Sequence, residues 1–340
     1  MNKNSHRIDI KNNCLSLIRL LAAFSVMYGH VITHLDIHIP EYVSKYILFI
    51  YGVPTFFAIS GMLIWKSIER ISSFNLFIKR RVFRIYPELW ASIAFNFLVM
   101  HMLYDDFKTG GIKIVFFGIS QGTVFQFWTP DFLRGYGCGT PNGSLWTIGV
   151  IVQSYVVLYF TYRLLHGKKN ISWITSILFF VLLSLCDNLL QSIFPNLAFK
   201  LYKQSFISYY WLFLIGAYIS EFFDLVVPFL KKYWIIFLLF NFAFYLLNIE
   251  INNSGYGILR CTLLVLWLVG FAYAYPCLKL NRDISFGLYL YHMIVVNAMI
   301  QLGFTGEIKY LLYCILISVV LAYVSTSSIG SWSAHKKVSL

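Results

Sequence analysis

The sequence predicts an all-α protein, a polytopic bundle of about ten transmembrane helices with both termini in the cytoplasm. Of its 340 residues, 59% are apolar and only 12% are charged, whereas an average soluble domain carries about 25% charged residues. Apolar windows of about 20 residues, long enough to cross a bilayer as helices, recur along the chain with short polar joints between them. The whole chain, residues 1–340, is expected to form one membrane-embedded domain surrounded by lipid.

Each predicted span is an apolar window bounded by polar or charged residues. The first contains Arg19 and is followed by no small-residue cleavage pattern, so it is not a removable signal sequence. A further apolar stretch, 112–128, is interrupted by Gly118 and Gly122, which indicates an interfacial or re-entrant segment, or else an eleventh span. The predicted spans are 15–34, 44–65, 84–104, 145–165, 171–190, 206–223, 232–250, 257–277, 285–303 and 308–328.

The basic residues set the predicted orientation. The formal net charge of +13 would fit a nucleic-acid partner if the charges shared one surface. When the spans alternate from a cytoplasmic N-terminus, however, most lysines and arginines fall in cytoplasmic joints, as membrane proteins prefer. No nucleic-acid partner is needed. The 6 cysteines stand singly, without metal-ligand spacing, so neither a metal nor a redox centre is expected.

The longest joint, residues 105–144, is predicted to lie on the outer side and is rich in glycine. Long ordered loops in compact domains are usually functional, although a disordered tether is the alternative. After the last predicted span only a short polar stretch follows, so no soluble C-terminal domain is expected.

Ionisable side chains inside a bilayer are costly and therefore mark candidate functional sites. Arg19 and His30 both lie in the first span and are eleven residues apart. They share one helix face to within about 20° and are separated by about 16 Å along the axis. The helix thus offers a cation near the cytoplasm and a titratable base toward the outer half. Snorkelling of Arg19 to the headgroups and an ordinary interhelical bond of His30 are the structural alternatives.

A second cluster stands at the cytoplasmic start of the third span, in the run KRRVFRIYP. Arg81 and Arg84 are three residues apart and adjacent on one helix face, which suits bidentate contacts with phosphate. Anchoring to anionic lipid is the alternative. Ser60 and Gly61, in the segment FFAISG, are small enough to let a neighbouring backbone approach. His292, in YLYH, is another buried titratable group, either catalytic or bonded to a backbone carbonyl.

Taken in order, these segments resemble the acyltransferase-3 family of integral membrane O-acyltransferases, which acylate bacterial cell-surface carbohydrates. The similarity is carried by the spacing of Arg19 and His30, FFAISG, the pair Arg81 and Arg84 leading into IYP, YLYH, and NGSLWTIGV at 142–150. The resemblance implies a ten-helix bundle in the bacterial inner membrane that uses acetyl-CoA or a related acyl-CoA, without a metal. It implies His30 as the catalytic residue and Arg19, Arg81 and Arg84 as CoA-binding residues.

The chain departs from the family pattern after the tryptophan. Family members commonly carry a glutamate where this chain has Ile151. Gln153 is the nearest polar group and can bind a hydroxyl but cannot act as a base. The acid is then supplied elsewhere, with Asp131 and Asp187 as candidates, or it is dispensable, or the protein is inactive. Ser60, Trp146, Gln153 and His292 are the predicted substrate-binding or supporting residues, with Trp146 most simply an interfacial anchor.

The predicted function is O-acetyl transfer to a hydroxyl of a glycan such as O-antigen, lipopolysaccharide or exopolysaccharide. His30 would deprotonate the acceptor or carry the acyl group as an acyl-imidazole. A glycolipid flippase with buried Arg and His along its path, or a membrane glycan polymerase, are the alternatives. The sugar, the hydroxyl and the acyl length are left open.

Overall fold

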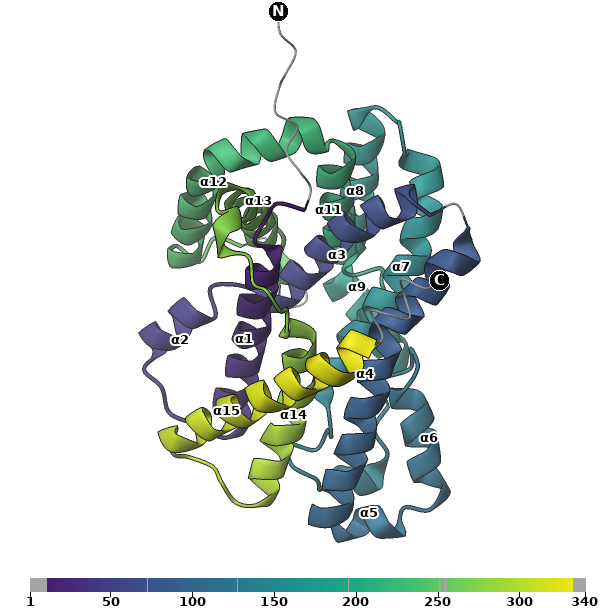
Figure 1. Cartoon of the computed structure of the whole chain (residues 1–340), viewed down its shortest axis with the longest axis vertical. Helices are drawn as coiled ribbons and strands as arrows, with labels where there is room; N and C mark the ends of the chain where they lie inside the picture. Colours follow the sequence, from purple (N-terminus) through teal and green to yellow (C-terminus); the bar gives the residue numbers. More distant parts are fainter. Residues whose placement is uncertain are drawn as a thin grey trace, which may run out of the picture.

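The structure is a computed structural model that describes residues 11–71, 73–126, 128–194, 196–250, 252–253 and 256–332. It is built almost entirely of helices (Figure 1). In chain order these are α1 (Leu15–His34), α2 (Glu41–Ile47), α3 (Gly52–Glu69), α4 (Phe74–Leu103), α5 (Asp105–Thr109), α6 (Ile112–Gln121), α7 (Trp146–Leu165), α8 (Asn170–Leu185), α9 (Asp187–Ile193), α10 (Asn196–Lys203), α11 (Tyr210–Glu221), α12 (Phe223–Leu246), α13 (Ile258–Ala274), α14 (Ser285–Gln301) and α15 (Ile308–Ser325). Short 3₁₀ turns are η1 (Asp131–Leu133), η2 (Gly143–Leu145) and η3 (Pro276–Leu278), η4 (Thr326–Gly330) is a π-helical turn, and β1 (Asn252–Asn253) pairs antiparallel with β2 (Tyr256–Gly257).

The all-helical architecture is confirmed, and every predicted span overlaps a helix. The span 15–34 has the bounds of α1, whereas 44–65 is divided between α2 and α3. Within the described residues, four helical segments are long and apolar enough to cross a membrane, and the pair α11 and α12, bent by 104°, would make a fifth. The number of ten spans and the cytoplasmic termini therefore stay predictions, and residues 1–10 and 333–340 lie outside the described residues.

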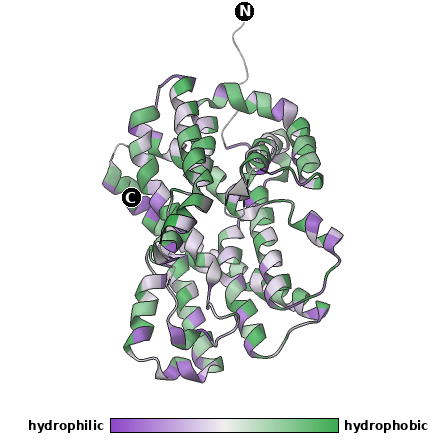
Figure 2. Ribbon diagram, turned by 180° about the vertical axis from the view of Figure 1, so that it is seen from behind, coloured by the Kyte–Doolittle hydropathy of each residue, from purple (hydrophilic) through white to green (hydrophobic). Residues whose placement is uncertain are grey.

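Apolar residues predominate along the helices (Figure 2), and many of their large side chains are exposed. Met102 of α4 and Leu164 of α7 are each 70% exposed, and Leu312 of α15 is 60% exposed. An apolar surface of this extent would be unfavourable in water but is what a bilayer interior requires. The outer surface thus supports a multi-pass membrane protein.

Helix α3 is held in the middle of the bundle, packed against α1, α7 and α11. The contact with α11 is a backbone contact made by two glycines. A Cβ on Gly61 would collide with the carbonyl of Phe213, and one on Gly216 would collide with the carbonyl of Ala58. The close approach predicted for Gly61 is confirmed, and it fixes the position of Ser60 beside it.

Helices α14 and α15 complete the core next to α1. α14 packs along α1, and α15 runs across both (Figure 1). The turn η4 reaches α4, where the buried carboxylate of Glu88 accepts hydrogen bonds from Ser325 and Thr326, each 3.3 Å long. This arrangement places α1, α3, α4, α7 and α14 around one interior space.

Candidate active site

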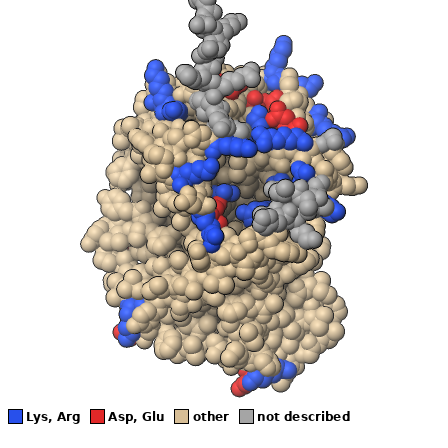
Figure 3. Space-filling view, in the orientation of Figure 1, with Lys and Arg blue, Asp and Glu red and all other residues tan. Residues whose placement is uncertain are grey.

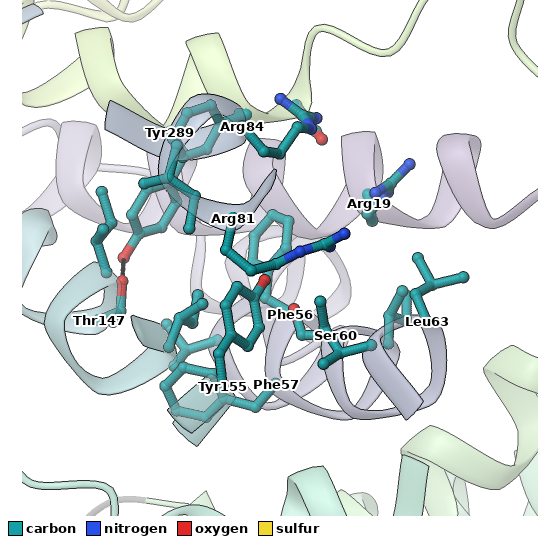
Figure 4. Close-up of a pocket in the computed structure, with 18 of the residues that line it drawn as sticks. Arg19, Phe56, Phe57, Ser60, Leu63, Arg81, Arg84, Thr147, Tyr155 and Tyr289 are labelled. Atoms are coloured by element: carbon teal, nitrogen blue, oxygen red, sulfur yellow. Dashed lines mark hydrogen bonds between the residues drawn. The ribbon is translucent and has the colours of Figure 1, made fainter. Parts of the chain in front are cut away.

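Three arginines from two helices line one cavity of about 340 Å³, here named the arginine cavity (Figure 4). Arg19 comes from α1, and Arg81 and Arg84 come from α4; Ser60 of α3 lies on the opposite wall. None of the described residues that line it is acidic. The cavity is thus a cationic space with an apolar far end, formed by side chains such as Phe56 and Ile148 from α3 and α7.

Neighbouring side chains orient the three guanidinium groups. Arg81 Nη2 donates to Ser67 Oγ at 3.0 Å, and Arg19 Nη2 lies 2.5 Å from Asp283 Oδ2. The other oxygen of Asp283 accepts the backbone N–H of Ser285, the first residue of α14, at 3.0 Å. Arg84 Nη1 lies 3.8 Å from Glu88. Each arginine therefore keeps donors available for a ligand, since a guanidinium carries five N–H groups.

A second cavity of about 450 Å³ adjoins the first and is here named the basic entrance. It shares Leu63, Ser67 and Arg81 with the arginine cavity. Lysines and arginines gather on the upper half of this face of the molecule, around a hollow in the surface (Figure 3). The other basic residues that line the entrance are Lys11, Lys66, Arg70, Arg80 and Lys279.

The opposite side of the bundle holds a third cavity of about 340 Å³, here named the histidine cavity. His30 and His34 of α1 line it, with ring centroids 5.8 Å apart, and Trp146 lines it from the start of α7. His30 Nδ1 lies 2.9 Å from Nε2 of His292, which is completely buried on α14. A titratable imidazole is thus placed at the wall of this cavity, with a second imidazole directly behind it.

The long joint 105–144 is ordered over its described residues and supplies one wall of the histidine cavity, including Gln126, Thr129 and Thr140. Asn297 of α14 anchors it by donating to the carbonyls of Thr140 and Pro141 at 3.1 and 3.0 Å. The functional interpretation of this loop is therefore favoured over a disordered tether. Cys138 also lines the cavity, but burial raises the pKa of its thiol, which is then a poor nucleophile at neutral pH.

Tyr289 lines the arginine cavity and lies against the imidazole of His292. Its hydroxyl donates to the Ser144 carbonyl at 2.8 Å and lies 2.6 Å from Thr147 Oγ1 (Figure 4). Its ring makes T-shaped contacts with two others, the ring of Phe56 in the arginine cavity and the buried ring of His292. The two cavities share no lining residue. The two cavities are thus separate in this structure, and Tyr289 contacts a residue of the arginine cavity on one side and the buried His292 on the other.

The predicted residues divide between the two cavities. Arg19, Ser60, Arg81 and Arg84 line the arginine cavity, together with Ile151 at the position of the family glutamate. His30 and Trp146 line the histidine cavity, and His292 lies directly behind His30. Gln153 lines neither cavity; it accepts the N–H of Phe206 at 3.1 Å and donates to the Gln204 carbonyl, which ties α7 to the segment before α11.

Four residues of the site were not singled out from the sequence. His34 and Glu88 each stand four residues after a predicted site residue, so the helical spacing could have found them. Tyr289 begins the segment YLYH and stands three residues before His292, so the same spacing could have found it, whereas Asp283 gave no such signal because its partner Arg19 lies far along the chain. Of the two acids proposed to replace the glutamate, exposed Asp131 of η1 does not line either cavity, and the Asp187 side chain lies outside the described residues.

Residues 12–330 match the sequence family of the acyltransferase domain, acyltransferase-3. The chain belongs to this family. It is 27% identical over 330 residues to nodulation protein 10 of Rhizobium leguminosarum bv. viciae, covering 89% of this chain and 88% of the relative. It is also 25% identical over 314 residues to an O-acetyl transferase of Shigella phage Sf6, covering 86% and 88%. No solved structure matches it significantly.

Family membership decides between the functions that the sequence left open. The protein is an acyltransferase of the membrane, and neither a flippase nor a polymerase is needed to explain its buried arginines and histidines.

Proposed function

We propose that this acyltransferase-3 protein is an O-acetyltransferase of the bacterial inner membrane, which moves acetyl from cytoplasmic acetyl-CoA to a hydroxyl of a cell-surface glycan. Acetyl is supported by the O-acetyl transferase of the Shigella phage, to which the chain is similar over most of its length. The observation that carries the proposal is the convergence of Arg19, Arg81 and Arg84 on one cavity, with a histidine pair beyond its far end.

The phosphates of acetyl-CoA fit the arginine cavity and the basic entrance. The Nε–H groups of Arg19, Arg80 and Arg81 are buried and have no hydrogen-bond partner in the described part of the chain. Buried donors of this kind are normally satisfied, and a phosphate oxygen is the acceptor that arginine binds best. The connected volumes would take the nucleotide in the entrance and the thioester arm in the narrower apolar end.

His30 is the proposed base, acting on an acceptor that enters the histidine cavity from the outer side. It removes the proton of the acceptor hydroxyl while the oxygen attacks the thioester carbonyl carbon. The carbon–sulfur bond then breaks, and the proton passes from His30 to the departing thiolate of CoA. Ester and CoA are the products, so the step needs no oxidant and no metal. Trp146 offers an aromatic face on which a sugar ring can lie.

Contact between the thioester and His30 requires Tyr289 to move. Its ring lies between Phe56 of the arginine cavity and His292, and it is held by the hydroxyl contacts to Ser144 and Thr147. We infer that the acyl end of the donor displaces this ring when the nucleotide is bound, because Tyr289 and Thr147 both line the arginine cavity that the donor would occupy.

The test is acetyl transfer by the purified protein in proteoliposomes. Radiolabelled acetyl-CoA on the cytoplasmic side should yield labelled glycan, and mass spectrometry should show a gain of one acetyl group per modified residue. His30→Ala should abolish transfer, whereas Arg163→Ala, which changes an arginine outside both cavities, should not. Normal transfer by folded His30→Ala would refute the role of His30; altered glycan length or a retained precursor, with no added acyl group, would refute acetyl transfer itself.

A further inference from the structure

The two histidines of the site form a directed hydrogen-bond chain. Nδ1 of His292 lies 3.1 Å from the carbonyl oxygen of Leu288, one turn earlier on α14. Nε2 of the same ring lies 2.9 Å from Nδ1 of His30, and the rings are nearly parallel, with 10° between their planes. His292 is completely buried, whereas His30 is partly exposed at the cavity wall. The chain thus runs from a backbone carbonyl to the cavity.

The chemistry of the groups fixes the direction of each bond. A carbonyl oxygen only accepts, so Nδ1 of His292 carries the hydrogen. A neutral imidazole has one N–H, so Nε2 of His292 is an acceptor. Nδ1 of His30 must therefore be the donor, and its hydrogen leaves Nε2 of His30 with a free lone pair. The alternative tautomer of His30 would place two lone pairs against each other.

We propose that His292 is a positioning residue that holds His30 in the Nδ1–H tautomer and keeps Nε2 available to act as the base. This inference rests on the proposed function, in which His30 removes the proton of the acceptor hydroxyl. In the transition state His30 gains a proton on Nε2, and its Nδ1–H donates to His292 more strongly as the ring becomes cationic. His292 itself stays neutral and touches no substrate.

This arrangement supplies an orienting partner in a site where Asp131, the candidate acid whose side chain is described, does not line the histidine cavity. In hydrolytic triads, a carboxylate orients the catalytic imidazole and selects its tautomer. A second imidazole performs the orienting part without placing a negative charge inside the bilayer, where an isolated charge is costly. The described titratable side chains against the pair are His34, beside His30, and Tyr289, beside His292.

The experiment compares three substitutions of His292 that separate its two hydrogen bonds. In His292→Gln the amide oxygen reaches the place of Nε2 and accepts from His30. In His292→Asn the shorter amide can donate to the Leu288 carbonyl but cannot reach His30. His292→Leu removes both bonds. Thermal melting in detergent and the binding of acetyl-CoA establish that each variant is folded.

We expect His292→Gln to keep kcat within about tenfold of the wild type, and the Asn and Leu variants to lose about 10²- to 10⁴-fold. KM for acetyl-CoA should not change, because His292 does not line the arginine cavity. If His292 had only a structural role, kcat would fall in all three variants in proportion to their loss of stability. Equal kcat for the Gln and Asn variants, or losses confined to KM, would overturn the proposal.

A spectroscopic measurement tests the tautomer without relying on turnover. In ¹⁵N-histidine-labelled protein in lipid, solid-state NMR distinguishes protonated from unprotonated ring nitrogens, and His30 is assigned by its loss in His30→Ala. The wild type and His292→Gln should show His30 protonated at Nδ1, and His292→Asn should not. A wild type that carries this tautomer but transfers no acetyl would refute the proposed function alone, whereas a wild type with His30 protonated only at Nε2 would refute the positioning role.

Discussion

Arg81 offers the sharpest test of donor binding, through the substitution Arg81→Ala. One of its terminal nitrogens donates to Ser67, and its remaining donors face the shared wall of the arginine cavity and the basic entrance. Loss of a hydrogen bond to a charged group costs about 1.5–3 kcal/mol, and about 1.4 kcal/mol corresponds to a factor of ten in affinity. We therefore expect Kd and KM for acetyl-CoA to rise by about 10- to 150-fold.

The assay uses two donors to show where the loss arises. Acetyl-CoA carries phosphates, whereas S-acetyl pantetheine has the same thioester arm without them. Arg81→Ala should weaken the binding of acetyl-CoA strongly and the binding of S-acetyl pantetheine hardly at all. The variant should therefore bind the two donors with nearly equal affinity. Arg163→Ala is the matched control, because this arginine stacks on Tyr159 outside both cavities. Equal losses with both donors would refute phosphate recognition by Arg81.

Three further predictions concern packing, the partition and orientation. Gly61→Ala should destabilise the protein by about 1–3 kcal/mol, seen as a lower melting temperature in detergent, because its Cβ meets the backbone of α11; Gly143→Ala, which meets only a methyl group at 3.6 Å, should not. Tyr289→Phe should increase acetyl-CoA hydrolysis without acceptor, measured as free CoA, because the ring loses both hydroxyl contacts; an unchanged rate would contradict its role as a partition. In a variant whose only cysteine is exposed Cys277, a membrane-impermeant maleimide should label intact cells only after permeabilisation, and labelling without it would reverse the predicted orientation.

Hydropathy predicted where helices lie but not how they turn. The bounds of α1 and the start of α15 agree with the predicted spans because polar residues end both apolar windows. The division of 44–65 into α2 and α3 was not predicted, and the predicted joint between 206–223 and 232–250 gave no indication of the 104° bend between α11 and α12. Window averages measure composition, whereas direction depends on contacts with other helices.

The sequence likewise predicted the charged residues of the site but not the residues that orient them. Charged groups in apolar helices pointed to Arg19, His30, Arg81 and Arg84, since such groups need a cavity or partner. Their partners could not be found in this way. His30 and His292 are 262 residues apart, and Arg19 meets Asp283 from the loop before α14. A single sequence, read without comparison to others, contains no information on which distant residues are in contact. The residues that orient the site could therefore be identified only from the fold.

The closed partition at Tyr289 also bears on how such an enzyme can remain in an energised membrane. A water-filled channel from the basic entrance to the outer side would let protons and ions dissipate the electrochemical gradient. In the proposed reaction, with an aromatic ring between the two compartments, only a two-carbon unit would change sides, while the nucleotide would stay with the cytoplasmic pool. The cell would thus modify a molecule beyond its membrane without exporting its coenzyme.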